Sequence, residues 1–448
     1  MKILIAYLIS LLVFVFLIKR AGGRKLSAPL YVPLCWMIFI LSRTLTQWLQ
    51  IRGYMSGKEA DLEGNSVDAT FLLVLIIIGL RILYVRRFNI KRIIKNNKAL
   101  FIFYGFALLS LLWVDSPLIG FKRWTKWSGS LVMVLLILSE ENYKAAINSL
   151  IKRCAYALIP LSIIFNKFIP NMGRSYSRGG GPDYHGVSTQ KNEYAALLLI
   201  CGIYLAWELI VSLRRKDYTA LKEIGYINTI FLVVIFWQLF FIDSKTSIIC
   251  LMVGIGVIFW LGHPYFKGFP LKALKYIVAF AIAAIFLQQV IDIKSRIISS
   301  AGRNPTLTTR TLLWADILEL PINPWVGTGW DTFWSGDKVT LLWEKRGWSP
   351  RSAHNGYLEI YISLGWAGIV LLFFVLLGAF RNSAASLITD FEYGCLSLSF
   401  FIILLFYNYS ESAFHRTSAI WFFSMLFCCI SIPKKNIGIE PIRRDSFS

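Results

Sequence analysis

Charged residues are scarce in this sequence. They make up 16% of its 448 residues, whereas a soluble domain contains about a quarter. Hydrophobic residues account for 56%, and the mean hydropathy is +0.59. Because so little polar surface cannot cover a chain of this size, lipid must be part of its solvent. The composition therefore excludes an ordinary soluble globular protein.

Metal-ligating and disulfide patterns are also missing. The seven cysteines all fall inside apolar segments, without a CxxC motif or a Cys/His pairing. The four histidines form no cluster with Asp or Glu at ligand spacing, and paired-carboxylate signatures are absent. We therefore predict no disulfide framework, no metal site and no cofactor, and we interpret the cysteines as small apolar side chains.

The formal net charge is nevertheless +22, with a pI of about 9.7. Nucleic acid would need a soluble basic domain to hold it, and the sequence contains none, so we predict no nucleic-acid partner. The Lys and Arg excess instead suits the cytoplasmic loops of a membrane protein, with a second excess facing an anionic ligand.

Long apolar runs dominate what is present. A spanning helix needs about 20 mostly apolar residues, although buried helices can be shorter. The sequence thus predicts an all-α polytopic integral membrane protein, one multispanning domain over residues 1–448 with about 12–13 transmembrane helices. The first segment lacks a small-residue cleavage site, which favours an anchor over a cleaved signal peptide. The candidate segments are 3–18, 28–42, 67–85, 99–114, 127–139, 150–166, 193–212, 226–242, 246–261, 273–291, 357–380, 396–409 and 417–432.

Basic residues mark alternate connections between these segments. The connections after every odd-numbered segment are mostly short and rich in Lys and Arg, which predicts that they are cytoplasmic. This assignment gives an outward N terminus and a cytoplasmic C terminus. The outward side then receives residues 43–66, 115–126, 167–192, 243–245, 292–356 and 410–416.

One outward connection is unusually long. Residues 292–356 form a loop of about 65 residues, far above the usual few, and contain six of the sixteen tryptophans. The stretch TLTTRTLLWADILEL is typical of a short amphipathic helix, capped by Thr308 or Thr309 and ended by Pro321. The tryptophans, Trp314 among them, suit stacking on sugar rings, but also packing of the loop and anchoring at the interface.

Cations on the outward side run against the usual charge distribution. They include Arg178 and Lys191 in 167–192, Lys245 in the very short DSKTS turn, and Arg310 in the long loop. Cations at several membrane entries predict a site for an anion at headgroup depth, and pyrophosphate is a natural candidate. Solvated surface or snorkelling is the alternative for each of them.

The stretch RSAHNGYLEIYISLGWAGIV places a histidine where a polar loop enters an apolar run. A histidine has its ordinary pKa near neutrality, so His354 is our candidate base for deprotonating an acceptor hydroxyl beside a lipid-borne leaving group. A hydrogen bond from His354 to a backbone carbonyl is the structural alternative. Asn355 is either a second polar group of the site or the cap of the following helix.

Four motifs in order resemble a known family: HGVSTQKNEYAALLLI, DSKTSII, TLTTRTLLWADILELPINPWVGTGWDTFW and SAHNGYLEIYISLGWAGIVLL. They are similar to those of the O-antigen ligase and Wzy-type polymerase superfamily, most of all the exopolysaccharide polymerases, over residues 170–380. The sequence departs from the pattern at Lys245, where the family often has Arg.

The resemblance implies a metal-independent glycosyltransferase of the bacterial inner membrane with its active site on the periplasmic face. Such an enzyme takes a glycan from undecaprenyl pyrophosphate and passes it, with inversion, to a lipid-linked repeat unit (polymerase) or to lipid A core (ligase). By position, Lys191, Lys245 and Arg310 match cationic positions near the pyrophosphate, and His354 matches the histidine that activates the acceptor. Arg178, Asn355 and Trp314 are further candidates for substrate binding.

Three functions remain open at this point. The motifs favour the polymerase, with membrane lipids and a chain-length regulator as further candidate partners, and hardly separate it from the ligase. A lipid-glycan transporter is less favoured, because transporters usually place ionisable groups at mid-bilayer, and few occur in these segments.

Overall fold

The structure is a computed structural model. It describes residues 26–50, 65–176, 181–269, 307–335, 338–346 and 350–431, together with residues 8, 11, 12 and 14–19, Lys272 and Lys275. All that follows concerns these residues. Apart from Lys275, the predicted segment 273–291 lies outside them, as does Arg178, and the predicted segment 3–18 is helical at the positions that are described.

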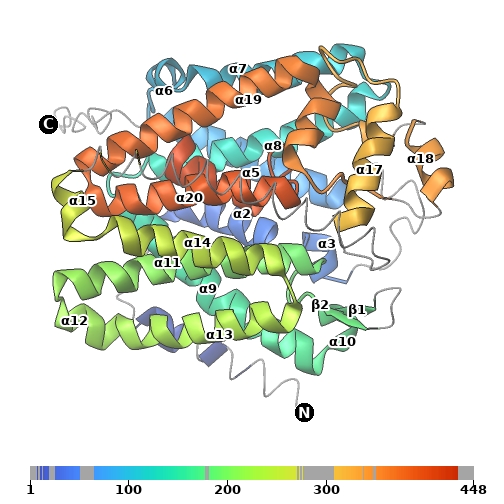
Figure 1. The fold of residues 1–448 in the computed structure, drawn as a ribbon. Helices are drawn as coiled ribbons and strands as arrows, with labels where there is room; N and C mark the ends of the chain where they lie inside the picture. Colours follow the sequence, from blue (N-terminus) through green and yellow to red (C-terminus); the bar gives the residue numbers. More distant parts are fainter. Residues whose placement is uncertain are drawn as a thin grey trace, which may run out of the picture.

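Within the described residues the chain forms a bundle of helices, drawn in Figure 1 with their axes running roughly across the view. Five helices are long and apolar enough to cross a membrane, and five shorter apolar helical segments accompany them. The chain is therefore an all-α polytopic membrane protein, as predicted. The long helices are α5 (Ser66–Val85), α9 (Tyr143–Phe168), α11 (Lys191–Arg215), α19 (Gly356–Thr389) and α20 (Phe391–Ser410). The shorter segments are η1 (Ala28–Leu30) with α2 (Tyr31–Leu41), α7 (Lys98–Leu109) with η2 (Ser110–Trp113), α13 (Tyr226–Ile242), α14 (Lys245–Leu261), and α21 (Ala419–Ser424) with η5 (Met425–Cys429).

Burial separates a central layer from an outer one. The most apolar windows of α11 and α20 are 67% and 72% buried inside the protein, whereas that of α5 is 28% buried. Large apolar side chains such as Phe240, Phe259 and Phe373 are exposed on the outer helices, which is the arrangement expected of faces in contact with lipid. All seven cysteines are free thiols, and six of them are buried.

Most predicted segments coincide with helices, and α13 has the predicted limits, 226–242. Several boundaries were wrong, and the two largest differences are in α8 (Pro117–Leu138) and α19. Helix α8 begins ten residues before the predicted 127, because the charges of Lys122, Arg123 and Lys126 made this part resemble a loop. Helix α19 continues to Thr389, so most of the predicted connection after 380 is helical, and only Asp390 separates α19 from α20.

The predicted connections gather at opposite ends of the bundle (Figure 1). Segments from the predicted outward side lie at the right-hand end of the view: α3 (Leu45–Trp48), α10 (Pro170–Gly173), β1 (Arg174–Tyr176), β2 (Pro182–Tyr184), α17 (Leu307–Glu319) and α18 (Lys338–Arg346). Segments from the predicted cytoplasmic side lie at the other end: α6 (Ile90–Asn96), α12 (Tyr218–Ala220), followed by η3 (Leu221–Gly225), and α15 (Pro264–Gly268). Strands β1 and β2 pair antiparallel, with Ser175 opposite Asp183.

The long loop is partly helical. Helix α17 ends at Glu319, before Pro321, as predicted, but it begins at Leu307, so Thr308 and Thr309 lie in its first turn and are not its cap. A second small core forms beneath the loop, where Leu313 and Ile317 pack with Phe333, in η4 (Phe333–Ser335). This core includes Ile362 of α19, so it packs the described part of the loop against the start of that helix.

Helix α19 is broken at Gly365, whose φ of 61° and ψ of −159° are not helical. The loop before Trp330 packs into the break: Gly329 N donates to the Ser363 carbonyl at 2.8 Å, and Trp366 N donates to the Pro324 carbonyl at 2.8 Å. A Cβ on Gly365 would lie 2.4 Å from the carbonyl carbon of Trp325, so only glycine fits. The first nine residues of α19 therefore take a different direction from the rest (Figure 1).

Candidate active site

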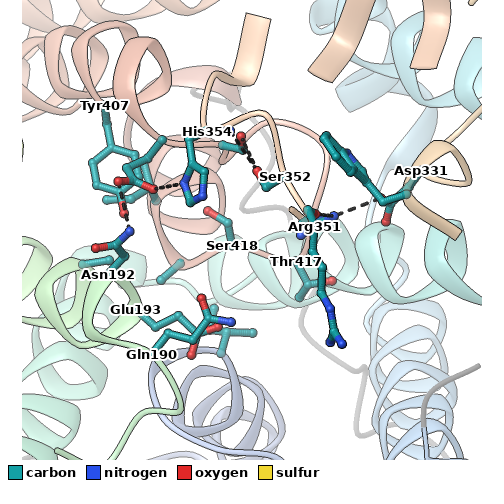
Figure 2. Close-up of a pocket in the computed structure, with 18 of the residues that line it drawn as sticks. Gln190, Asn192, Glu193, Asp331, Arg351, Ser352, His354, Tyr407, Thr417 and Ser418 are labelled. Atoms are coloured by element: carbon teal, nitrogen blue, oxygen red, sulfur yellow. Dashed lines mark hydrogen bonds and ion pairs between the residues drawn. The ribbon is translucent and has the colours of Figure 1, made fainter. Parts of the chain in front are cut away.

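A cavity of about 620 Å³ opens at the end of the bundle that carries the long loop. Its walls come from α8, the start of α11, the loop residues 331–354 and the segment 407–420 (Figure 2). Four cationic side chains line it, Arg123, Lys126, Arg351 and Arg416, with three carboxylates, Glu193, Asp331 and Glu411, and one histidine, His354. A cavity of this size accommodates small-molecule groups such as sugar units.

His354 is held in an uncommon backbone conformation directly before α19. Its φ is 49°, in the left-handed region, and its N–H donates to Ser352 Oγ at 3.1 Å. The Nδ1 atom lies 3.3 Å from Glu411 Oε2. Because an ionised carboxylate only accepts, this contact favours the tautomer with the proton on Nδ1, which leaves Nε2 as the basic nitrogen. Nε2 has no partner among the residues that the structure describes.

Glu411 connects three elements that are distant in the sequence. Its Oε1 accepts from Asn192 Nδ2 at 3.0 Å and from Arg310 Nη2 at 3.3 Å, while its Oε2 faces His354. Its backbone carbonyl accepts from Gly356 N at 3.0 Å. The side chain of Glu411 is 12% exposed, so water screens these contacts only in part. Glu411 thus fixes the imidazole of His354 and the guanidinium of Arg310 relative to each other.

Of the three predicted cations that the structure describes, one belongs to this cluster, one lies at its edge and one pairs with another residue. Arg310 belongs to it through Glu411, and it also donates to the Ser410 carbonyl. Lys245 is exposed at the first position of α14, and the next residue, Thr246, has its Oγ1 3.0 Å from Ser410 Oγ, which puts the start of α14 at the edge of the cluster. Lys191 begins α11 but lies outside the cavity lining and pairs with Asp183 at 3.1 Å.

The other predicted residues have structural contacts. Asn355 is the N-cap of α19, and its Oδ1 accepts from Tyr357 N and Leu358 N at 3.0 and 3.1 Å. Trp314 Nε1 donates to the Ala353 carbonyl at 2.7 Å, so this ring braces the loop beside His354 from outside the cavity. The tryptophans that line the cavity are Trp334 and Trp343.

Sequence reasoning missed Glu411, Asn192, and the two cations of α8. Arg123 and Lys126 fell in a stretch that was interpreted as a connection, yet they line the cavity from the second and third turns of a helix. Glu411 is a single acid in a short outward connection, separated from His354 by 57 residues. Its proximity to His415 and Arg416 in the sequence was a signal that could have drawn attention to it.

A buried polar cluster supports the loop that carries His354. Glu359 is 1% exposed and accepts from Ala353 N at 2.7 Å, Ser352 Oγ at 3.0 Å and Trp334 Nε1 at 2.8 Å. The His415 Nε2 atom lies 3.6 Å from Glu359 Oε2. Burial lowers the pKa of His415, and the charge of Glu359 opposes this shift. The cluster therefore fixes the backbone of residues 352–354 from behind.

The fold and the cavity define a class of protein: a polytopic helical membrane protein whose polar site, at one end of the bundle, combines a carboxylate-bound histidine with several cations. Comparison with known proteins refines this. Residues 230–373, which include Arg310 and His354, match the family model described as O-Antigen ligase. The exopolysaccharide production protein ExoQ of Rhizobium meliloti (strain 1021) is 23% identical over 308 residues. That match covers 65% of this chain and 66% of the relative, just under two thirds of its length.

The two matches support the resemblance to the O-antigen ligase and Wzy-type polymerase superfamily that the motifs predicted. The family model ends before Glu411, so the match covers His354 and Arg310 but not the carboxylate that joins them.

Proposed function

We propose that the protein is a glycosyltransferase that polymerises undecaprenyl-pyrophosphate-linked oligosaccharide repeat units, with His354 as the base. One observation carries this proposal: His354 lines a cavity of about 620 Å³ while Glu411 holds its Nδ1, so that Nε2 is left to accept a proton. The family matches support the same class of substrate, a lipid-linked glycan.

The reaction follows from these groups. Nε2 of His354 takes the proton of an acceptor sugar hydroxyl, and the hydroxyl oxygen forms a bond to the anomeric carbon of the donor. The bond from that carbon to the pyrophosphate oxygen breaks, and the lipid pyrophosphate leaves with the electron pair. Attack opposite the leaving group inverts the anomeric centre. Pyrophosphate is a good leaving group, so the site needs a base and positive charge more than a strong acid.

Arg310 and Lys245 are the residues that we assign to the departing pyrophosphate. Arg310 is fixed beside His354 by Glu411, and Lys245 is exposed at the edge of the same cluster. Lys191 takes part only if it exchanges Asp183 for the substrate. Arg178 is a candidate by resemblance alone, since it lies outside the described residues.

Charge also supports an orientation. The end opposite the cavity carries basic segments, for example Arg214 and Arg215 at the end of α11 and Lys91, Arg92 and Lys95 in α6. The positive-inside rule then makes that end cytoplasmic. We propose the bacterial inner membrane as the location, with the cavity facing the periplasm.

The second candidate is an O-antigen ligase, which performs the same chemistry on a different acceptor. The description of the matching family model favours it. The two functions differ in the product: a polymerase joins repeat units to one another, and a ligase joins the glycan to lipid A core.

The test is a reconstituted reaction of the purified protein with lipid-linked repeat units, with and without lipid A core. We expect polymer from repeat units alone, and none from His354→Ala. A matched control is His263→Asn, which changes a histidine next to α15 at the other end of the bundle and should keep full activity. Normal polymer from a well-folded His354→Ala would contradict the proposal. A product formed only with lipid A core would favour the ligase.

A further inference from the structure

A group of cations that does not include Arg310 lines the cavity. Arg123 and Lys126 come from α8, and Arg416 comes from the segment after α20. In Figure 2, Arg351 and Asp331 lie to one side of His354, and Asn192 and Tyr407 lie to the other. Arg123 and Arg416 both contact Asp331, so these two cations lie on a side of the cavity that is separate from the Glu411 cluster.

These cations differ in the hydrogen bonds and ion pairs that they already make within the protein. Arg123 donates to the Asp331 carbonyl and to Ser335 Oγ, the latter at 3.3 Å. Arg416 Nη2 donates to the Arg351 carbonyl at 2.7 Å, and its Nε lies 3.6 Å from Asp331 Oδ1. The loop therefore holds both arginines in position, and some of the donors of each guanidinium are already used within the protein.

Lys126 has neither a hydrogen bond nor an ion pair in the part of the chain that the structure describes. Its ammonium lies 5.3 Å from the ring centre of Phe39, a cation–π contact that weakly stabilises the charge. The nearby acids have donors of their own: Asp68 accepts from Thr46 N and Oγ1 at 3.0 and 2.7 Å, and Glu193 accepts from Thr189 Oγ1 at 2.6 Å. Lys126 therefore lines the cavity without a direct partner, and the charges of Asp68, Glu193 and Asp331 act on its ammonium only from beyond ion-pair distance.

An ammonium without a direct partner in the wall of a partly enclosed cavity loses hydration without gaining a hydrogen bond, which is costly unless a ligand supplies one. We propose that Lys126, with Arg416, forms an oxyanion subsite for the glycan substrate, separate from the group that Arg310 receives. This inference rests on the proposed function. Lys126 contributes a point charge to the subsite, and Arg416 contributes the directed donors of a guanidinium.

The oxyanion has two possible sources in a lipid-linked glycan. It is a carboxylate on a sugar near the reacting hydroxyl, or a phosphate of the lipid carrier. The half-buried Trp343 lines the same cavity and has an aromatic ring of the kind that stacks on sugars, so either source would arrive together with a sugar.

The experiment compares Lys126→Gln with Lys122→Gln, a control on the same helix whose side chain is exposed and outside the cavity lining. Three probes are used with both proteins: polyprenyl diphosphate without sugar as a competitor, and a neutral and an acidic lipid-linked glycan as substrates. We expect Lys126→Gln to raise KM by about tenfold or more with little change in kcat, since a hydrogen bond to a charged group is lost. Lys126→Arg should keep most of the affinity.

The probes separate the two sources. A carboxylate ligand gives the KM effect with the acidic glycan only. A phosphate ligand gives it with both glycans, and it weakens inhibition by polyprenyl diphosphate to the same extent. The subsite is refuted if Lys126→Gln matches Lys122→Gln with all three probes. Failure of the proposed function is a different result, because wild-type protein would then form no glycosidic bond, and direct binding of the three probes to both variants would still test the subsite.

Discussion

Replacing Glu411 with Gln tests whether the carboxylate controls the base. The substitution keeps the shape of the side chain but removes its charge and one of its acceptors. Glu411 contacts His354 Nδ1 and Arg310 Nη2, both at 3.3 Å, and Asn192 Nδ2 at 3.0 Å. A glutamine can keep the bond from Asn192 through its carbonyl, but it cannot make both charge-assisted contacts.

The magnitude follows from these contacts. A hydrogen bond to a charged group contributes about 1.5–3 kcal/mol, and a neutral one about 0.5–1.5 kcal/mol. Replacing two charged contacts by neutral ones therefore removes about 2–3 kcal/mol of the free energy that holds the imidazole and the guanidinium in place. At about 1.4 kcal/mol for each factor of ten, kcat should fall by about 10²-fold. KM should change little, because in this proposal the glutamate does not touch the substrate.

The assay is the initial rate of polymer formation by reconstituted protein over a range of repeat-unit concentrations. Glu140→Gln is the matched control, since it also removes a glutamate from an ion pair, with Arg86 at 2.6 Å, in the connection between α8 and α9. It should keep the wild-type rate. If Glu411→Gln folds normally and its kcat stays within about twofold of wild type, the carboxylate does not orient His354 and the reasoning fails.

Three further predictions concern stability and substrate contact. Gly365→Ala should destabilise the protein in detergent by at least about 2 kcal/mol, because its φ of 61° and the adjacent backbone exclude a Cβ; an unchanged unfolding midpoint would contradict this. Trp314→Phe should lower kcat a few-fold at constant KM through the lost 2.7 Å bond to Ala353, whereas a raised KM would indicate that the ring contacts sugar. Burial lowers the pKa of His185 and His415, so the folded chain binds protons at these two sites less readily than the unfolded chain, whose histidines titrate near about pH 6.5; stability should therefore fall as the pH drops through this value, and less steeply in His415→Gln, as unfolding measured from pH 7 to 5 would reveal.

Apolar runs were enough to predict most of the bundle. Helix α13 has its predicted limits because no charged residue interrupts its run, while Glu223 stands shortly before it and Asp243 directly after it. The start of α8 could not be predicted in the same way. Hydropathy counts Arg123 and Lys126 as breaks in a span, but it cannot say that these side chains face a polar cavity inside the protein, where a charge is tolerated.

The candidate site was predictable in part for a similar reason. His354 could be selected from its position at the entry to a span, which is a local property of the sequence. The role of Glu411 depends on a contact between two loops 57 residues apart, which no local pattern encodes. Asn355 and Trp314 illustrate the converse, since residues chosen for their chemistry turned out to cap a helix and brace a loop.

The contact between His354 and Glu411 depends on the geometry of the hairpin that α19 and α20 form. The two helices are joined at one end through Asp390 alone, but α19 has 34 residues and α20 has 20. At about 1.5 Å per residue, straight helices would be about 51 and 30 Å long, and the start of α19 would lie about 20 Å beyond the end of α20. The break at Gly365 reduces this mismatch, because the nine residues before it turn away from the axis of the rest of α19 (Figure 1), whose remaining part would be about 36 Å long. A backbone hydrogen bond of 3.0 Å from Gly356 N to the Glu411 carbonyl then joins the start of α19 to the residue that follows α20. The position of the proposed base should therefore depend on Gly365, which takes no part in the reaction itself. A protein with an altered break at Gly365 should keep its membrane helices but lose the contact between His354 and Glu411.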